Sequence, residues 1–185
     1  VHGGNFGYLG AAVCAANWDL NFDGLAQWFH VYAIDKLGQG HTDNPKNDDD
    51  YTMSAVVRHA YEFLQTMGLR NVHLVGSSRG GYLVARLTLE HPDLVKSCII
   101  TDSESLSPPV GEPYVRLAAP EPHASKESQR WSLQRASFKY DHITDDLLDA
   151  MTEVANLPKY QETVVKMETE GLKDKLFLPM LKKDK

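Results

Sequence analysis

The chain has 185 residues, a formal net charge of −6 and 42% apolar side chains. This length and apolar fraction suit one globular domain with a core and a lid, and they argue against a disordered chain. The acidic balance without a basic block argues against a nucleic-acid surface, and no apolar run approaches the roughly 20 residues that a membrane helix needs.

Cysteine usage and the first residues bear on the cellular compartment. Cys14 and Cys98 lie in apolar surroundings without CxxC spacing, which predicts buried thiols in a reducing compartment. The opening VHGGNFG has neither the charged start nor the apolar core of a signal peptide. We therefore expect a cytoplasmic protein. No His, Cys or Asp cluster has metal-ligand spacing, so we expect no metal and no organic cofactor.

Three apolar runs predict strands, and amphipathic stretches separate them. The runs are HVYAID, VHLVGS and SCIIT, at residues 30–35, 72–77 and 97–101. The first reads as a short buried strand, and the second has the continuous apolar character of a parallel strand covered on both faces. Alternation of strand and helix predicts an α/β fold with a parallel sheet flanked by helices.

Two helices are predicted between these strands. Apolar residues recur at helical spacing from Met53 to Leu64, with Thr52 as the N-cap and Gly68 as the left-handed terminator. A second helix is predicted over about 80–90, ending before a proline.

The composition changes at about Ser107, where a proline-rich stretch begins. Residues 143–157 then predict an amphipathic helix capped by Thr144, and Pro158 begins another helix. We expect two parts, an incomplete α/β-hydrolase-like core and a helical cap without strands of its own, at residues 1–107 and 108–185.

The stretch LVGSSRGG links the second predicted strand to its helix and carries the pattern G-x-S-x-G as Gly76, Ser78 and Gly80. At such a corner a serine hydroxyl projects away from the sheet, and the residues two positions away must be small. We therefore predict Ser78 as a nucleophile. Ser77 is the rival, but its glycine spacing is wrong.

Backbone donors for an oxyanion are predicted at two places. The residue after the nucleophile, Arg79, offers its N–H at the start of the helix. The glycine-rich opening HGG brings a second N–H close, from Gly4 or Asn5. His2 is expected to brace this loop rather than to act as a base.

In this order and spacing, HGGNFG, AIDKLGQGHTDNP and LVGSSRGG resemble the α/β-hydrolase superfamily. Within it, DKLGQGHTDNP and the helical insert resemble the meta-cleavage product hydrolases. The resemblance implies a small, largely apolar substrate with a carbonyl group, namely a vinylogous diketone of aromatic degradation whose C–C bond is hydrolysed. Lid residues would line its pocket, with candidates Trp131, Leu133, Phe138, Ile143, Leu148 and Met151.

The sequence departs from that subfamily at three places. Asn5-Phe6-Gly7 stands in place of a Gly-Pro-Gly run, and Ser77 in place of an asparagine. The subfamily keeps an arginine on the lid helix that matches ITDDLLDAM, where it binds the substrate carboxylate, and Met151 stands near that place. The possible substitutes are Arg116, Arg130 and Arg135.

A serine hydrolase also needs an acid and a histidine base, which follow the serine in this superfamily. The candidate acids are Asp102 and Glu104, after the strand SCIIT. None of the eight histidines lies where the family places its base. We therefore expect this chain to be an internal piece of a longer protein.

Two other functions remain open. The same serine and oxyanion donors would serve a carboxylic ester or lactone hydrolase. A non-catalytic protein with a hydrolase fold is the third reading, because the acid and base are not assigned here. Epoxide hydrolases and haloalkane dehalogenases are disfavoured, since they have an aspartate where Ser78 stands.

Overall fold

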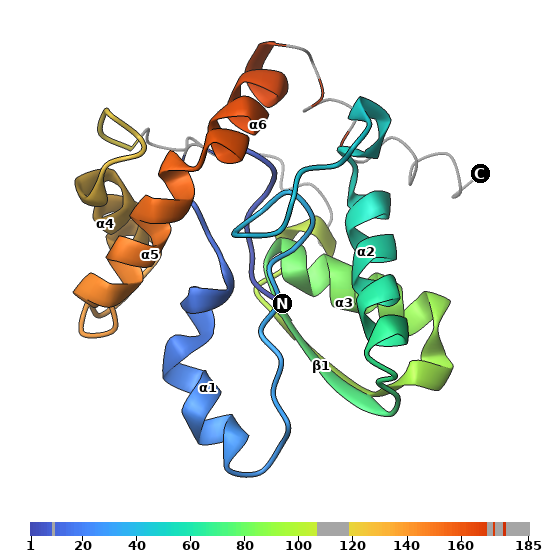
Figure 1. Ribbon diagram of the computed structural model, residues 1–185. Helices are drawn as coiled ribbons and strands as arrows, with labels where there is room; N and C mark the ends of the chain where they lie inside the picture. Colours follow the sequence, from blue (N-terminus) through green and yellow to red (C-terminus); the bar gives the residue numbers. More distant parts are fainter. Residues whose placement is uncertain (9, 107–118, 170–171, 173–175, 177–185) are drawn as a thin grey trace.

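The computed structural model describes residues 1–8, 10–106, 119–169, 172 and 176. A two-stranded parallel sheet with helices α2 (Met53–Thr66) and α3 (Arg79–Glu90) forms one part (Figure 1). Helices α4 (Lys126–Arg135), α5 (Asp145–Asn156) and α6 (Pro158–Thr169) form a second part beside it (Figure 1). The α/β class with a parallel sheet and flanking helices is therefore confirmed. The predicted boundary at 107/108 lies outside the described residues and stays a prediction.

Strands β1 (Val72–Ser77) and β2 (Val95–Thr101) run parallel, and Ser77 is paired with Thr101 at their carboxyl ends. The backbone N–H of Ser78 then donates to the carbonyl of Thr101 at 2.9 Å. The carboxyl ends of parallel strands share one edge of a sheet, and this edge is where ligands bind in open α/β folds.

Helix α3 (Arg79–Glu90) packs on both strands, and α2 (Met53–Thr66) packs against α3. The cap of α2 is as predicted, because the Thr52 hydroxyl accepts from the Ala55 N–H at 3.2 Å. Gly68 has a φ of 64° just after the helix. The two helices and β1 bury a common core, whose members include Val56, Leu64, Leu74, Leu83 and Leu87.

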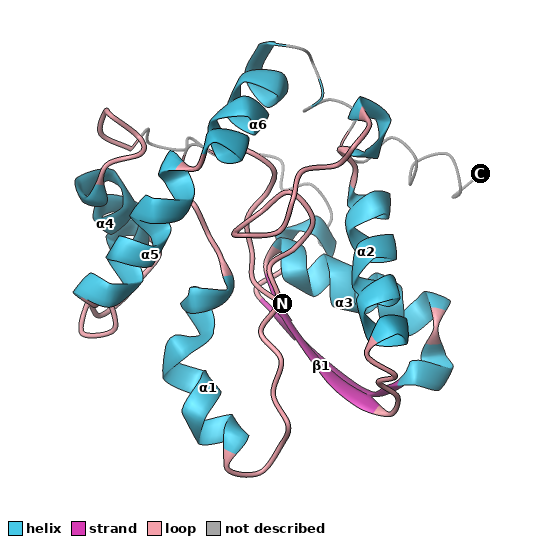
Figure 2. Ribbon diagram, in the orientation of Figure 1, coloured by secondary structure: helices cyan, strands magenta, loops and turns pink. Residues whose placement is uncertain are grey.

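The sheet differs from the prediction in two respects. Residues 30–35 form an extended connection without strand pairing, drawn as loop in Figure 2, so the strand predicted there is wrong. A strand needs a ladder of backbone hydrogen bonds, and the described residues provide none beside this segment. Coverage of β1 on both faces is also not observed, since His73 and Ile99, on adjacent strands, are exposed.

The second part contains α4 (Lys126–Arg135), α5 (Asp145–Asn156) and α6 (Pro158–Thr169). As predicted, Thr144 caps α5, because its hydroxyl accepts from the Leu147 N–H at 3.2 Å. No strand lies in the described range 119–169. Segment 10–16 crosses from the core to these helices and shares a hydrophobic cluster with α5 through Ala12 and Cys14.

Side-chain hydrogen bonds fasten this part to the core. The Tyr160 hydroxyl donates to the Tyr8 carbonyl at 2.6 Å, and the Asn44 amide donates to the Lys159 carbonyl at 2.9 Å. Cys14 is buried as predicted, and burial raises the pKa of its thiol to about 11. Cys98 is only half-buried.

Short helical elements complete the described chain. One α-helix, α1 (Asp19–Ala26), was not expected from the sequence, and neither was α4. The 3-10 turns are η1 (Ala15–Trp18), η2 (Asp48–Asp50), η3 (Pro92–Leu94) and η4 (Glu104–Leu106).

Candidate active site

The corner between β1 and α3 has the geometry that its glycines predict. Ser78 has φ 52° and ψ −120°, which is a costly conformation for a residue with a side chain. A Cβ atom on Gly76 would lie 2.8 Å from the backbone nitrogen of Gly81 and would collide with the carbonyl of Gly80. The strand and the helix therefore approach as closely as they do because the residue at 76 is glycine.

Contacts from β2 hold the corner in place. Besides the bond from the Ser78 N–H to Thr101, the Ser103 hydroxyl donates to the Ser78 carbonyl at 2.7 Å. Gly81 lies against Ser103, with 2.8 Å between an added Cβ on Gly81 and the Ser103 Cβ. Hydrogen bonds thus hold both the backbone N–H and the carbonyl group of the strained Ser78.

The opening His-Gly-Gly turn lies against this corner. A Cβ atom on Gly3 would be 3.1 Å from the Ser78 Cβ and 3.7 Å from its Oγ. The next residue, Gly4, has a φ of 77°, in the left-handed region that favours glycine. Among the described residues, neither the Gly4 nor the Asn5 N–H donates a hydrogen bond. The structure thus brings Gly3, the residue before the predicted donors Gly4 and Asn5, against Ser78. The role of Gly4 and Asn5 as oxyanion donors stays a prediction.

His2 is buried and both of its ring nitrogens are engaged. Its Nδ1 donates to the Gly3 carbonyl at 2.8 Å, and its Nε2 accepts from the Lys36 N–H at 3.2 Å. Burial is the main reason that the pKa of His2 lies well below its usual value, and the Lys36 charge adds to the effect. A neutral ring with no free nitrogen braces the loop and has no lone pair for a base.

Lys36 is a residue of the site that sequence reasoning missed. It is 1% exposed, and its Nζ donates to the Gly4 carbonyl at 2.8 Å. Burial, with the Arg79 charge as a second cause, lowers the pKa of Lys36 to about 7. The available signal was a lone lysine between the apolar run HVYAID and the glycine turn that follows it.

Asp35, the neighbour of Lys36, ties three segments together. Its carboxylate accepts from the Ala15 N–H at 2.6 Å and from the His41 N–H at 2.8 Å. It also lies 3.6 Å from the Nε2 of His2. The loop after residue 35 is therefore fixed relative to the oxyanion loop.

The candidate acids follow β2, on the strand next to that of Ser78. Asp102 has a φ of 51°, so it shares with Ser78 a left-handed backbone at the carboxyl end of a strand. Asp102 and Glu104 are both exposed. Their role as acids stays a prediction.

Four of the other histidines have local partners. The ring nitrogens of His73, His123 and His142 contact Ser97, Glu121 and Ser137 respectively. The ring of His91 stacks on that of Tyr61, with 3.8 Å between the centroids.

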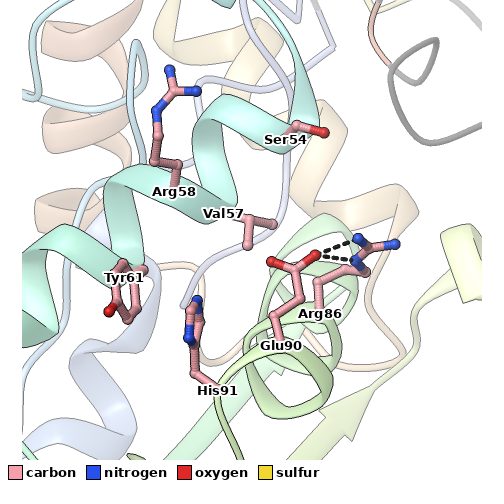
Figure 3. A pocket seen from close by; sticks show the side chains of 7 residues that line it. All are labelled: Ser54, Val57, Arg58, Tyr61, Arg86, Glu90 and His91. Carbon is pink, nitrogen blue, oxygen red and sulfur yellow. Dashed lines mark hydrogen bonds and ion pairs between the residues drawn. The ribbon is translucent and has the colours of Figure 1, made fainter. Parts of the chain in front are cut away.

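A hollow of about 260 Å³ between α2 and α3 is lined mostly by polar side chains, and its charged side chains have partners (Figure 3). Arg86 pairs with Glu90, and Arg58 pairs with Asp50 at 2.6 Å. Because α3 rises about 1.5 Å per residue, Glu90 lies roughly 18 Å along the helix from Ser78. This hollow therefore lies away from the corner.

The predicted pocket residues of the cap have different surroundings. Leu148 and Met151 are completely buried and Ile143 is buried, whereas Phe138 is 98% exposed. Trp131 borders a hollow of about 330 Å³ together with Gln134, Arg135 and Tyr140. Leu148, Met151 and Ile143 therefore form core, and the lining of a substrate pocket stays a prediction.

The candidate carboxylate-binding arginines are engaged elsewhere where they are described. Arg130 pairs with Asp145 at 3.0 Å, and the Arg135 guanidinium lies 5.1 Å from the Trp131 ring centroid. Arg116 lies outside the described residues.

The described part of the chain lacks both a metal-ligand cluster and a membrane-spanning helix. It contains no group of three or more His, Cys, Asp or Glu side chains arranged for a metal ion. None of its helices has both the length and the apolar character required to cross a membrane.

Comparison with known proteins agrees with this geometry. A family model described as the alpha/beta hydrolase fold matches residues 1–147. A 2-hydroxymuconate semialdehyde hydrolase from Pseudomonas sp. (strain CF600) is 29% identical over 152 residues, 82% of this chain and 53% of that protein. A 2-hydroxy-6-oxo-6-(2'-aminophenyl)hexa-2,4-dienoic acid hydrolase from Metapseudomonas resinovorans is 33% identical over 107 residues, 57% of this chain and 35% of that protein.

Among solved structures, a meta-cleavage product hydrolase from Pseudomonas fluorescens IP01 is similar, with a TM-score of 0.65 and 26% sequence identity. The match covers 91% of this chain and 60% of that chain. By length, the match to the 2-hydroxymuconate semialdehyde hydrolase from Pseudomonas sp. (strain CF600) spans about half of that protein, 53%.

Proposed function

The chain belongs to the α/β-hydrolase fold family, and on that premise we propose that the intact protein is a hydrolase with Ser78 as its nucleophile. The observation that carries this proposal is the contact between the strained corner and the oxyanion loop. Ser78 has a φ of 52°, and an added Cβ on Gly3 would be 3.7 Å from its Oγ. A carbonyl group bound there would meet a hydroxyl and backbone donors together.

In the proposed reaction the Ser78 oxygen attacks the carbonyl carbon, and a histidine base of the intact protein takes the hydroxyl proton. The carbonyl oxygen becomes an oxyanion, which accepts hydrogen bonds from the Arg79 N–H and from the Gly4 or Asn5 N–H. The tetrahedral adduct then collapses: the bond between the carbonyl carbon and the leaving group breaks, the leaving group takes the proton from the histidine, and an acyl-serine remains. A water molecule, deprotonated by the same histidine, attacks the acyl carbon and releases the carboxylic acid and the Ser78 hydroxyl. Asp102 and Glu104 are candidates for the acid that orients the base.

The substrate class that the relatives favour is a meta-cleavage product, with cleavage of a C–C bond next to a carbonyl group. The relatives named above act on 2-hydroxymuconate semialdehyde and on a 2-hydroxy-6-oxo-hexadienoic acid, by their names. A small-molecule substrate of this kind is largely apolar and carries a carbonyl group. We propose the same class for the intact protein.

A carboxylic ester or lactone is the second candidate substrate, and the arginines favour it. Met151 is fully buried, and Arg130 and Arg135 have partners of their own. Among the described cap residues, no subfamily-type arginine is left to bind a substrate carboxylate, whereas a neutral ester needs none.

The test is to assay the intact protein on a coloured dienoate diketone beside a p-nitrophenyl ester. We expect Ser78→Ala to lower kcat by about 10³-fold or more on the preferred substrate, because the nucleophile is lost. Ser77→Ala, one residue away, is the matched control and should retain activity. A Ser78→Ala variant with near wild-type turnover would remove the proposal, and an intact protein that consumes neither substrate would support the non-catalytic reading.

A further inference from the structure

Two successive peptide units of the oxyanion loop are held by their carbonyl groups. His2 donates to the Gly3 carbonyl and Lys36 donates to the Gly4 carbonyl, both at 2.8 Å. The two side chains are linked in turn, because the Lys36 N–H donates to His2 at 3.2 Å. They therefore act as one brace behind the loop.

The complete burial of Lys36 is unusual for a lysine side chain. Lys36 is among the largest fully buried side chains, and lysine is almost never buried unless it is paired. Taking an ammonium group out of water costs free energy that a hydrogen bond to a neutral carbonyl only partly offsets. A residue retained at that cost, next to a predicted reaction site, is a candidate for a functional role.

The loop itself needs such a brace. Gly4 has a φ of 77° and follows another glycine, so its peptides can reorient with little steric resistance. In a trans peptide the N–H points opposite to the C=O. A hydrogen bond to the Gly4 carbonyl therefore fixes the direction of the Asn5 N–H, which donates to no described residue.

The surroundings define the two sides of the loop. Gly3 lies against Ser78 on one side, whereas Val13 and Gln39 lie next to Gly4, within 3.3 Å and 3.7 Å of an added Cβ. Rotation of the Gly4 peptide would leave Lys36 without its acceptor. The brace thus favours one orientation of the peptide between Gly4 and Asn5.

We propose that Lys36 is a positioning residue of the oxyanion hole, which holds the Gly4 carbonyl and so directs the Asn5 N–H at the oxyanion formed on attack by Ser78. This inference rests on the proposed function. Lys36 acts through the backbone and does not touch the substrate. When Lys36 is protonated, its ammonium group also polarises the Gly4–Asn5 peptide, which strengthens the Asn5 N–H as a donor.

Substitution tests this role in the intact protein. Lys36→Met keeps an unbranched side chain, one heavy atom shorter, and removes the donor. Because loss of an oxyanion donor costs about 10²- to 10³-fold in kcat, we expect loss of its positioning group to cost roughly 10- to 100-fold, with KM changed less than about threefold. The matched control is Lys46→Met, an exposed loop lysine, which should leave both constants unchanged.

A second readout separates positioning from general damage. Phenylboronic acid forms a tetrahedral adduct with a serine hydroxyl, and we expect Lys36→Met to weaken its binding by the same factor as kcat. A kcat and a boronate affinity within about twofold of wild type would overturn the inference, while Ser78-dependent turnover would leave the proposed function standing. Absence of Ser78-dependent turnover in the wild-type protein would instead count against the proposed function.

A measurement on the wild-type protein covers the case in which Lys36→Met does not fold. In the intact protein labelled with ¹⁵N, we expect the Asn5 amide proton to shift downfield when phenylboronic acid binds, because it donates to the adduct. An Asn5 amide that does not respond, in a protein that binds the boronate through Ser78, would overturn the inference.

Discussion

Gly76 lies so close to Gly80 that a methyl group on the first would collide with the carbonyl oxygen of the second. This contact sets the sharpness of the turn on which Ser78 stands. The packing of β1 against α3 therefore requires glycine at position 76, independently of any reaction at Ser78.

Gly76→Ala should destabilise the intact protein by about 3 kcal/mol, because overpacking against backbone cannot be relieved by a rotamer change. Urea denaturation measures the free energy of unfolding. Gly24→Ala is the control, since Gly24 lies in α1 with nothing within 4 Å of an added Cβ. This second change should stabilise by about 0.5–1 kcal/mol. Equal effects of the two substitutions on the free energy of unfolding would contradict the close contact of Gly76 with the Gly80 carbonyl.

The stability of the protein should depend on pH through Lys36. Burial, with the Arg79 charge as a second cause, lowers the folded pKa from 10.5 to about 7, and the groups that face Lys36 include His2, which is neutral. Between these two pKa values the unfolded chain binds a proton that the folded chain does not. The free energy of unfolding therefore rises with pH, by at most about 1.4 kcal/mol per pH unit.

Lys36→Met isolates this contribution. The destabilising effect of the lysine is fully present below pH about 7 and fades as the pH approaches 10.5. Urea titrations across this range should show the variant more stable than wild type at the acid end, with the difference shrinking toward the alkaline end. A constant difference would mean that Lys36 titrates normally in the folded protein.

Tyr160→Phe should loosen the attachment of α6 to the chain at Tyr8. The lost hydroxyl donates to the Tyr8 carbonyl at 2.6 Å from a buried ring, and loss of such a bond costs about 1–2 kcal/mol. Tyr140→Phe is the control, since Tyr140 is exposed. Thermal unfolding of both variants is the measurement, and a Tyr160→Phe variant as stable as wild type would show that the bond contributes nothing.

Arg130→Gln and Arg135→Gln should leave the KM for a carboxylate-bearing dienoate within about twofold of wild type. Arg130 is already paired with Asp145, and Arg135 lies over the Trp131 ring. Exposed pairs of this kind contribute about 0–1 kcal/mol to stability, so both variants should fold. A tenfold rise in KM for either variant would identify it as the carboxylate ligand and favour the C–C substrate over the ester.

Elements with a clear apolar period were predictable from sequence. The stripe from Met53 to Leu64, the run 72–77 and the helix after Thr144 all appear where their patterns place them. Helices without such a stripe were missed. Helix α1 buries no residue, and the buried residues of α4 are the polar Ser128 and Gln129, so neither has an apolar face for a pattern to reveal.

The strand at 30–35 shows the opposite failure. Its β-branched and apolar residues fit a strand, but pairing depends on a neighbour distant in the sequence, which no local pattern supplies. The brace of the oxyanion loop is of the same kind. Lys36 meets Gly4 across 32 residues, and only the fold reveals that contact. Gly76, Ser78 and Gly80 were recognisable because their constraint is local to one turn.

Gly7 lies directly against the backbone of α6, with 2.7 Å between an added Cβ and the nitrogen of Val164. Helix α6 therefore touches the chain at Gly7, a few residues after Gly4 and Asn5. Replacing α6 by the helix of a related protein would therefore also affect a contact outside α6. The new helix must leave room for Gly7 to contact its backbone at positions 163–164. Otherwise the replacement would displace Gly7 and, with it, the loop that carries Gly4 and Asn5.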